Sequence, residues 1–422
     1  MPDASKPRNR RPVFTLQALI LAALGAALFG WLAMLGTGCG PGLGAVEITA
    51  TTSTSPTGTP TPGPLSGDVL IAGGINAAGN AVGTAEIYNP TTEIFSNTGT
   101  MITARAFHTA TELANGTILL TGGQNASGTP LSSAEIYNES NQLFHATAGK
   151  MVAARSLQAA TALQNGHVLI TGGVGSGGIP LATAEIYTPS TGEFTATSSN
   201  MNFKRAAHTA TLLNNGQVLI AGGYSDVGRT TVQNTAELYN PSNQTFTTIT
   251  DRMLDNRYFD QAQLLTGATL NGYVLLAGGH DTNVVTATAE LYNPSAQAFI
   301  TTASVMTISR MQFASAVLQS GQVLLCGGLT NASTVTQTAE IYTPGGVFGP
   351  TGNMTDFRRY HTATAFVTGP LIGEVLVTGG QDSTTIASTV STAELYDPAF
   401  NSFTATDSMA NSRYGQTAVI LP

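Results

Sequence analysis

The charged residues that could bind a ligand concentrate in one part of a chain that is otherwise poor in charge. Charged side chains make up only 9% of the 422 residues. We call residues 226–281 the charged sector, because its loops place several carboxylates beside arginine and histidine. Clustered carboxylates suit a hard cation such as Ca²⁺, and the same groups suit a polar ligand. Exposed loops also carry charge simply because they are solvated, so the sequence leaves these interpretations open. The candidate ligand-binding residues are Asp226, Arg229, Asp251, Arg252, Asp255, Tyr258, Asp260, His280 and Asp281.

The histidines and cysteines do not have the spacing of a metal centre. His108, His208 and His361 each follow an arginine by three residues and are far apart in the chain, so we do not expect them to meet at one metal ion. Beyond Cys39 the one cysteine is Cys326, which follows a hydrophobic run where the equivalent positions hold Ala or Thr. A small buried side chain is therefore expected there. We predict no metal and no other cofactor.

These residues are embedded in a repeat of about 50 residues. Each copy has a Gly-Gly pair, then Ala-Glu-Ile/Leu-Tyr, then Phe, then Met-x-x-x-Arg. A period near 50 residues indicates a β-propeller built from four-stranded blades. Seven copies therefore predict an all-β domain of seven blades over residues 68–422. The Gly-Gly pairs begin at positions 73, 122, 172, 222, 278, 327 and 379.

Four strands can be assigned within one copy. "RAAHTATLL" (205–213) is the innermost strand A, and "NNGQ" is a tight turn that leads into the apolar strand B, "VLIAGG". "AELYNP" is strand C, and the segment around Phe246 is strand D. In such a blade the B–C loops and the D–A connections share one face, which we call the loop face. These loops differ most between copies, so we expect binding there. Aromatic residues beside the strand A starts are expected at the channel mouth, where they either stack on a sugar or peptide or only plug the channel. They are Phe107, Phe203, Tyr258, Phe357, Tyr360 and Tyr414.

The repeated glutamates and arginines are predicted to be structural. A functional site needs asymmetry, and seven equal copies in fixed phase supply none. We therefore expect Glu–Arg pairs within or between blades. The arginines are Arg105, Arg155, Arg205, Arg257, Arg310, Arg358 and Arg413, and the glutamates are Glu86, Glu135, Glu185, Glu237, Glu290, Glu340 and Glu394.

The two ends of the repeat region complement each other. The first copy begins at strand B, near Asp68, without a strand A before it, and the last copy stops after a strand A that runs from Arg413 to Pro422. Pairing the two pieces would make the seventh blade. It would also close the ring and remove two exposed strand edges.

The repeat resembles the kelch family. The stretch "ARAAHTATLLNNGQVLIAGG…AELYNPSNQTF" has the arginine, hairpin, double glycine and Glu-x-Tyr-Asn-Pro strand of that family, and the resemblance covers residues 68–422. It implies a kelch-type β-propeller in a bacterial protein. The chain departs from the pattern in having Phe where kelch units usually have Trp, and its one Trp is Trp31.

Galactose oxidase is similar to kelch propellers. A resemblance of this chain to that enzyme would imply a copper site with two histidines and a tyrosine crosslinked to cysteine. This chain has no residues left over for a further domain, and Cys326 lies within a strand. We therefore expect no enzyme activity, with a galactose-oxidase-like carbohydrate-active enzyme as the alternative.

The N-terminal segment predicts attachment to a membrane. Residues 13–35 are long and apolar enough to span a bilayer as a helix, and the basic residues before them favour a cytoplasmic start. "LGTGC" then ends at Cys39 and is similar to a degraded bacterial lipobox, which makes Cys39 a candidate for lipidation. Residues 1–39 are therefore either a signal anchor or a lipoprotein signal peptide. Residues 40–67, rich in Pro, Thr, Ser and Gly, are expected to be a disordered linker.

Charge and organisation together predict the class of function. Beyond Cys39 the chain has 12 basic and 23 acidic residues, a net charge of −11, which excludes nucleic acid as an expected partner. We expect a monomeric propeller that is tethered to the membrane outside the cytoplasm and binds a protein or glycan through its loop face. The remaining alternative is a surface or adhesion component without a specific small ligand.

Overall fold

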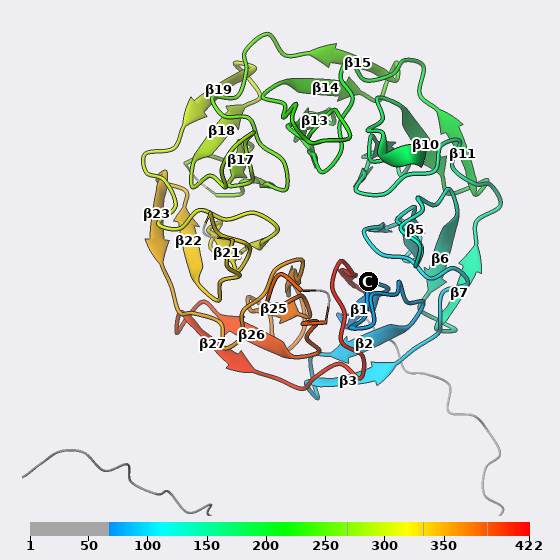
Figure 1. Ribbon diagram of the computed structural model, residues 1–422, viewed down its shortest axis with the longest axis vertical. Coiled ribbons are helices and arrows are strands. Elements are labelled where there is room, and N and C mark those ends of the chain that lie inside the picture. Colours follow the sequence, from blue (N-terminus) through cyan, green and yellow to red (C-terminus); the bar gives the residue numbers. More distant parts are fainter. Residues whose placement is uncertain (1–66, 268, 332, 386) are drawn as a thin grey trace, which may run out of the picture. The chain divides into compact units, whose positions relative to one another are not determined.

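The chain folds into seven antiparallel sheets of four strands each, arranged in a ring around a central channel (Figure 1). This computed structural model describes residues 67–267, 269–331, 333–385 and 387–422. The predicted seven-bladed, all-β propeller is confirmed. The expectations for the apolar segment 13–35, for Cys39 and for linker residues 40–66 fall outside the described residues. Within the described ranges, no helix is long and apolar enough to cross a membrane.

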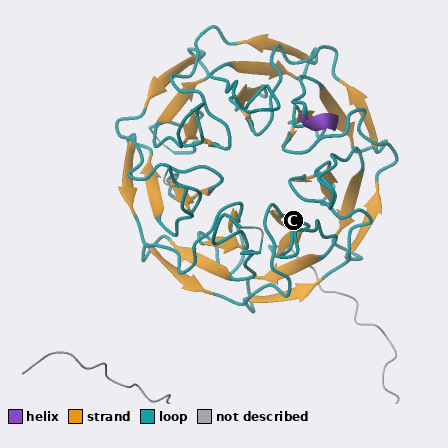
Figure 2. Cartoon of the chain, viewed as in Figure 1, coloured by secondary structure: helices purple, strands orange, loops and turns teal. Residues whose placement is uncertain are grey.

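Each blade has the strand order A–B–C–D from the channel outward (Figure 2). The A strands are β4 (Thr109–Glu112), β8 (Ala159–Ala162), β12 (Thr209–Leu212), β16 (Gln261–Leu264), β20 (Ala314–Val317), β24 (Thr362–Ala365) and β28 (Thr417–Ile420). The B strands are β1 (Val69–Ala72), β5 (Ile118–Thr121), β9 (Val168–Thr171), β13 (Val218–Ala221), β17 (Val274–Ala277), β21 (Val323–Cys326) and β25 (Val375–Thr378).

The outer half of each blade consists of strands C and D. The C strands are β2 (Ala85–Asn89), β6 (Ala134–Asn138), β10 (Ala184–Thr188), β14 (Ala236–Asn240), β18 (Ala289–Asn293), β22 (Ala339–Thr343) and β26 (Ala393–Asp397). The D strands are β3 (Ile94–Asn97), β7 (Leu143–Ala146), β11 (Glu193–Ala196), β15 (Thr245–Thr248), β19 (Ala298–Thr301), β23 (Val347–Pro350) and β27 (Ser402–Ala405). One short 3₁₀ helix, η1 (Ser176–Gly178), lies in a B–C loop.

The core lies between neighbouring blades. Every B strand is buried along its whole length, as its unbroken apolar sequence predicts, because a blade packs against a neighbour on each face. Strand A is shorter than predicted, spanning 209–212 rather than 205–213 in the copy used above. Residues 205–208 instead anchor the blade and contact its neighbours, and a positive φ at Ala207 interrupts the extended backbone.

A buried ion pair joins the inner and outer parts of every blade. Arg105, just before strand A, donates to Glu135 of strand C over 2.7 Å, and also to the carbonyl oxygens of Gly122 and Ser133. Glu135 in turn accepts the backbone N–H groups of Ile102 and Thr103. The same pairing occurs within all seven blades, at 2.5–3.1 Å. The predicted Glu–Arg pairing is confirmed, and it lies within blades.

The Gly-Gly pair connects one blade to the next. The backbone N–H of Gly74 donates to the carbonyl oxygen of Arg105 in the following blade over 2.9 Å, and the equivalent bond recurs at every interface between blades. A Cβ on Gly73 would lie 2.4 Å from that same oxygen, and φ at Gly73 is +66°. Only glycine therefore fits this close approach.

The two ends of the propeller domain share one blade. Strand β28, at the C-terminus, pairs with β1 in the register Val69–Ile420 to Ala72–Thr417. Arg413 then reaches Glu86 of the same sheet at 2.8 Å. The predicted closure of the ring by pairing of the terminal strands is confirmed, and the C-terminus lies beside β1 (Figure 1).

Deleting residues 413–422 should open the ring. The deletion removes β28 and leaves Glu86 buried without its arginine, and breaking such a buried pair typically costs about 3–5 kcal/mol. We expect a large fall in the thermal unfolding temperature, whereas deletion of the exposed Pro422 alone should change it little. Equal melting of the two deletion variants would contradict the closure.

A single substitution that removes one charge of the pair should have a comparable effect in an intact blade. Glu135→Gln leaves the Arg105 charge buried without its counter-ion, so we expect a loss of about 3–5 kcal/mol in the free energy of unfolding, measured with urea. Arg252→Gln, on an exposed side chain, is the control and should change stability by less than about 0.5 kcal/mol. A loss below about 1 kcal/mol for Glu135→Gln would show that the pair is not structural.

Candidate functional site

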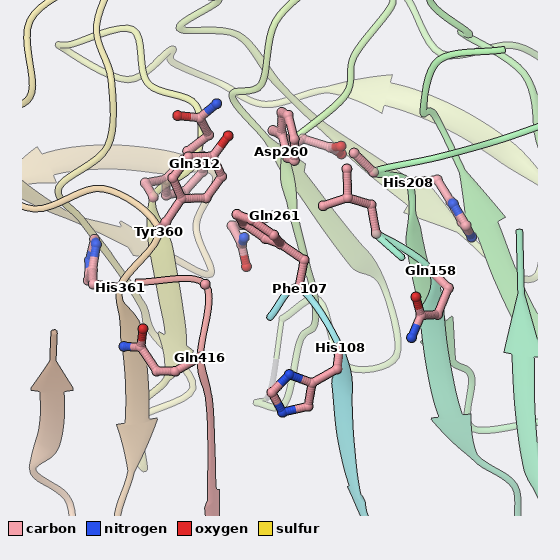
Figure 3. A pocket seen from close by; sticks show the side chains of 15 residues that line it. Phe107, His108, Gln158, His208, Asp260, Gln261, Gln312, Tyr360, His361 and Gln416 are labelled. Atoms are coloured by element: carbon pink, nitrogen blue, oxygen red, sulfur yellow. The ribbon is translucent and has the colours of Figure 1, made fainter. Parts of the chain in front are cut away.

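A cavity lies at the mouth of the channel on the loop face (Figure 3). Its volume is about 270 Å³, and side chains from all seven blades line it. All but Gln261 come from two positions of the repeat, two and three residues after the repeated arginine. Because the residues at these two positions vary between blades, the cavity wall is asymmetric although the scaffold around it repeats.

The first of these positions forms a closed ring of hydrogen bonds. Each residue donates its backbone N–H to the carbonyl oxygen of its counterpart in the neighbouring blade, at 2.8–3.2 Å, all the way around the channel. All seven have φ between +51° and +63°. The left-handed conformation costs a non-glycine residue roughly 1–2 kcal/mol, so the ring holds these residues in a strained backbone. The members are Phe107, Leu157, Ala207, Phe259, Gln312, Tyr360 and Gly415.

Aromatic side chains cross the mouth in a continuous series of contacts that we call the aromatic band. Successive ring centroids lie 5.3–6.0 Å apart in tilted or edge-to-face geometry, which is favourable for aromatic pairs. In order of contact, the members are Tyr224, Tyr258, Phe259, Tyr360, Phe107 and Tyr414.

The aromatic band was predicted in part. Aromatic residues beside the strand A starts were expected at the channel mouth, and Phe107, Tyr258, Tyr360 and Tyr414 belong to the band. Two others expected there lie outside the band: Phe203 packs against the Arg205 guanidinium, and Phe357 is 47% exposed at another part of the surface. Tyr224 and Phe259 were missed, although the ring position of Phe259 could have been found by aligning the copies.

Two arginines lie against the aromatic band. The Arg229 guanidinium is 5.1 Å from the Tyr224 ring and 5.9 Å from the Phe259 ring, and that of Arg359 is 5.4 Å from the Tyr360 ring. Arg359 also donates to the side-chain oxygen of Gln312 at 3.2 Å. Unlike the seven repeated arginines, these two have no carboxylate within ion-pair distance in the described part of the chain.

The second lining position fills the interfaces between blades. At this position, three residues after the repeated arginine, the side chain contacts the end of strand B in the preceding blade. Gln158 donates to the Thr121 carbonyl oxygen at 2.8 Å, and His208 is 2.9 Å from the Thr171 hydroxyl. His108 and His361 lie at two other interfaces, so the three histidines are held apart by the blades. Burial lowers the pKa of His208 and of His361 to about 3.

Asp260 is the exception in this series. It is 4% exposed, and both of its carboxylate oxygens lack a hydrogen-bond partner. The strand B end of the preceding blade is Ala221, which has no side-chain donor to offer. Burial raises the pKa of Asp260 to about 7, although the Arg257 charge acts in the opposite direction. A buried carboxyl without a donor is costly when ionised.

The structure brings together four of the nine candidate residues in the charged sector. Arg229 and Tyr258 contact the aromatic band, Asp260 lines the cavity, and the His280 ring packs on Tyr258 with a centroid distance of 5.3 Å. His280 also contacts the carbonyl oxygen of Asp281 through Nδ1.

The other five candidate residues have local structural partners. Asp226 and Asp281 accept N–H groups from their own loops, and Asp251 accepts the Phe299 N–H of the next blade at 2.7 Å. Asp255 lies 3.6 Å from Arg257, and Arg252 donates to the Asn234 side chain at 3.4 Å. The carboxylates do not converge, and no group of three or more His, Cys, Asp or Glu that could hold a metal ion is found in the described ranges.

The isolated thiol is structural, as expected. Cys326 is a free, fully buried cysteine at the end of β21, with its sulfur 3.6 Å from Nε2 of His361. Burial raises the pKa of the thiol to about 12, which removes the thiolate form that a nucleophile or metal ligand requires.

Comparison with known proteins supports the fold. No protein family matches the chain by sequence, and no curated protein does. Among solved structures, the chain is similar to the structure of YjhT, with a TM-score of 0.55 and 13% sequence identity. The similarity covers 72% of this chain and 98% of YjhT. At this level of identity it shows the β-propeller fold alone.

Asp260→Asn should change stability in a pH-dependent way. The folded state holds a proton on Asp260 up to about pH 7, whereas the unfolded chain releases it near pH 4. Stability of the wild type should therefore fall as pH rises from about 4 to 7, by up to about 4 kcal/mol at 1.36 kcal/mol per pH unit.

The neutral amide escapes this penalty, so Asp260→Asn should be the more stable protein at pH 8, with the gain shrinking toward pH 4. Urea unfolding at several pH values measures it. Asp255→Asn, at a carboxylate whose side chain is 40% exposed, is the control. A difference between wild type and Asp260→Asn that does not vary with pH would mean that Asp260 has a hydrogen-bond donor in solution.

Proposed function

We propose that the protein is a non-enzymatic binding module that is tethered to the membrane outside the cytoplasm and binds a protein or glycan partner at the channel mouth on its loop face. The single observation that carries the proposal is the aromatic band, which crosses the mouth with two arginines against it. Rigid aromatic side chains and arginine are the residues that most often dominate binding energy at interfaces.

The asymmetry of the mouth supports a binding site. The repeated Arg, Glu and Gly-Gly residues form the scaffold, and a scaffold needs no difference between blades. At the ring position, however, large aromatic residues occupy three blades, while Ala207 and Gly415 occupy two others. The aromatic band therefore crosses the mouth between particular blades only, as expected of a surface that recognises one ligand orientation.

The chemistry of the cavity also favours binding over catalysis. The histidines that line it are wedged between blades with lowered pKa values, so they remain neutral and structural. Asp260 has a pKa near neutrality, but among the residues that the structure describes no nucleophile or second acid–base side chain is hydrogen-bonded to it. Catalysis by acid–base or nucleophilic groups needs such a combination of residues.

The position of the first described residues is compatible with tethering. Strand β1 begins at Val69 on the face of the A–B turns, where the Gly67 N–H donates to the Leu421 carbonyl oxygen. A tether that precedes residue 67 would therefore join the propeller on the face opposite the loop face. The kelch-type repeat, which we also infer, is compatible with this role but does not identify a partner.

The double variant Phe259→Ala/Tyr360→Ala should lose the partner. Both residues belong to the ring, and Ala207 shows that alanine is compatible with that backbone conformation. We expect binding to weaken by at least about 30-fold, which is the effect of losing one aromatic hot spot worth about 2 kcal/mol. The measurement is retention of partners from cell-envelope extract on the immobilised full-length protein.

Phe357→Ala is the matched control for this experiment. Phe357 is a 47% exposed phenylalanine that lies outside the aromatic band, so its loss should leave retention unchanged. A partner that is retained equally by the wild type and by both variants would place binding elsewhere and contradict the proposal. The proposal would also be contradicted if the wild type retained no partner.

A further inference from the structure

We propose that the ligand of the channel mouth is an acidic carbohydrate, whose carboxylate group is bound by Arg229 and Arg359 while a sugar ring lies on the aromatic band. This inference rests on the binding function proposed above and specifies the class of ligand. It is carried by the placement of two arginines that have no carboxylate partner in the described part of the chain.

The first step concerns charge. The propeller is strongly acidic, and its seven repeated arginines are buried in ion pairs with glutamate. Five further basic residues remain beyond Cys39. Two of these five, Arg229 and Arg359, contact rings of the aromatic band. A guanidinium has five N–H donors, of which Arg359 uses one for the Gln312 side chain and one for the Thr384 carbonyl oxygen, while its Nε has no partner in the described part of the chain. The remaining donors of such a group can form two parallel hydrogen bonds with a carboxylate.

The second step concerns the spacing of the two arginines. Arg229 lies against the Phe259 ring and Arg359 against the Tyr360 ring, and these two rings are 5.8 Å apart. Both guanidinium charges also lower the pKa of Tyr360, against the larger effect of burial, so both act on the same hydroxyl. An anionic group above Phe259 and Tyr360 would therefore interact with both positive charges.

The third step concerns the carboxylates around the mouth, which do not form ion pairs with Arg229 or Arg359 in the described part of the chain. Asp226, in the same loop as Arg229, instead accepts the N–H groups of Thr230 and Thr231. Asp281 accepts the N–H groups of Asn283 and Val284. Asp260 lines the cavity from a buried position, and burial favours its uncharged form.

The fourth step distinguishes a sugar from a peptide. Beside the aromatic rings, glutamine side chains line the cavity at Gln261, Gln312 and Gln416. Hydroxyl groups of a sugar can form hydrogen bonds with the amide groups of Gln261 and Gln312, while its apolar ring face packs on the aromatic side chains. A cavity of about 270 Å³ is slightly smaller than the roughly 300–1,000 Å³ of pockets for drug-sized ligands, and this volume suits a single sugar unit.

The test is calorimetric titration of the full-length protein with acidic oligosaccharides. The probes are trimers of galacturonate, glucuronate and mannuronate. Each is compared with its methyl ester, in which an uncharged ester group replaces the carboxylate. We expect at least one acid to bind at least tenfold more tightly than its ester, and this preference to decrease as salt is added.

The variants are Arg229→Asn, chosen because asparagine tolerates the +58° φ at this position, and Arg359→Gln. Each should reduce affinity for the acid at least tenfold and leave affinity for the ester nearly unchanged. Arg252→Gln is the matched control, since Arg252 is exposed but contacts no aromatic ring of the band, and it should bind as the wild type does. Thermal unfolding of each variant verifies that it is folded.

Three results would overturn the inference. Equal affinity for acid and ester would show that the mouth binds sugars without reading charge, which leaves the proposed binding function intact. Binding of an acidic peptide, such as tri-glutamate, with the same arginine dependence and no binding of any sugar would assign the site to a peptide. Absence of binding by every probe would reject an acidic ligand. The proposed binding function would then still be tested by the retention experiment with Phe259→Ala/Tyr360→Ala.

Discussion

The buried ion pair between arginine and glutamate is the interaction on which the rest of the propeller depends. In each blade it links the start of strand A to strand C, and the arginine also binds two backbone carbonyl groups. Neither charge reaches solvent, so each would be costly without the other. By fixing the arginine, the pair fixes the two residues that follow it, and those residues form the wall of the channel mouth.

The fixed scaffold explains how seven similar blades produce an asymmetric surface at the channel mouth. The ring of backbone hydrogen bonds determines where each side chain at the mouth lies but leaves its identity free. Phe259, Tyr360 and Ala207 therefore occupy equivalent ring positions in three different blades. A ligand site can arise from such substitutions without any change in the strands, as in other folds where loops and strand ends carry function on a constant framework.

The sequence was sufficient for the fold and insufficient for the site. The sequence predicted seven blades, Glu–Arg pairs within or between them, and closure of the ring by the terminal strands, because these features repeat or complement each other along the chain. Which glutamate pairs with which arginine, such as Glu86 with Arg413, became clear only in the structure. The site was harder, because charge in a loop does not reveal its partner. Asp226 and Asp281 were candidate ligands, yet their oxygens bind their own loops. Arg359 was not singled out, because it follows the repeated Arg358 directly, and its contact with Tyr360 becomes visible only in three dimensions.

Hydrogen exchange of the seven ring amides tests most directly the claim that the mouth is one closed unit. Each amide N–H donates to the ring carbonyl oxygen of the preceding blade, and that of Gly415, close to the C-terminus, donates to Tyr360. We expect all seven amides to exchange with the same free energy of opening, equal to that of global unfolding. Faster exchange at Gly415 and Phe107 alone would show that the ring opens where the chain ends meet, and would contradict a mouth held rigid by its scaffold.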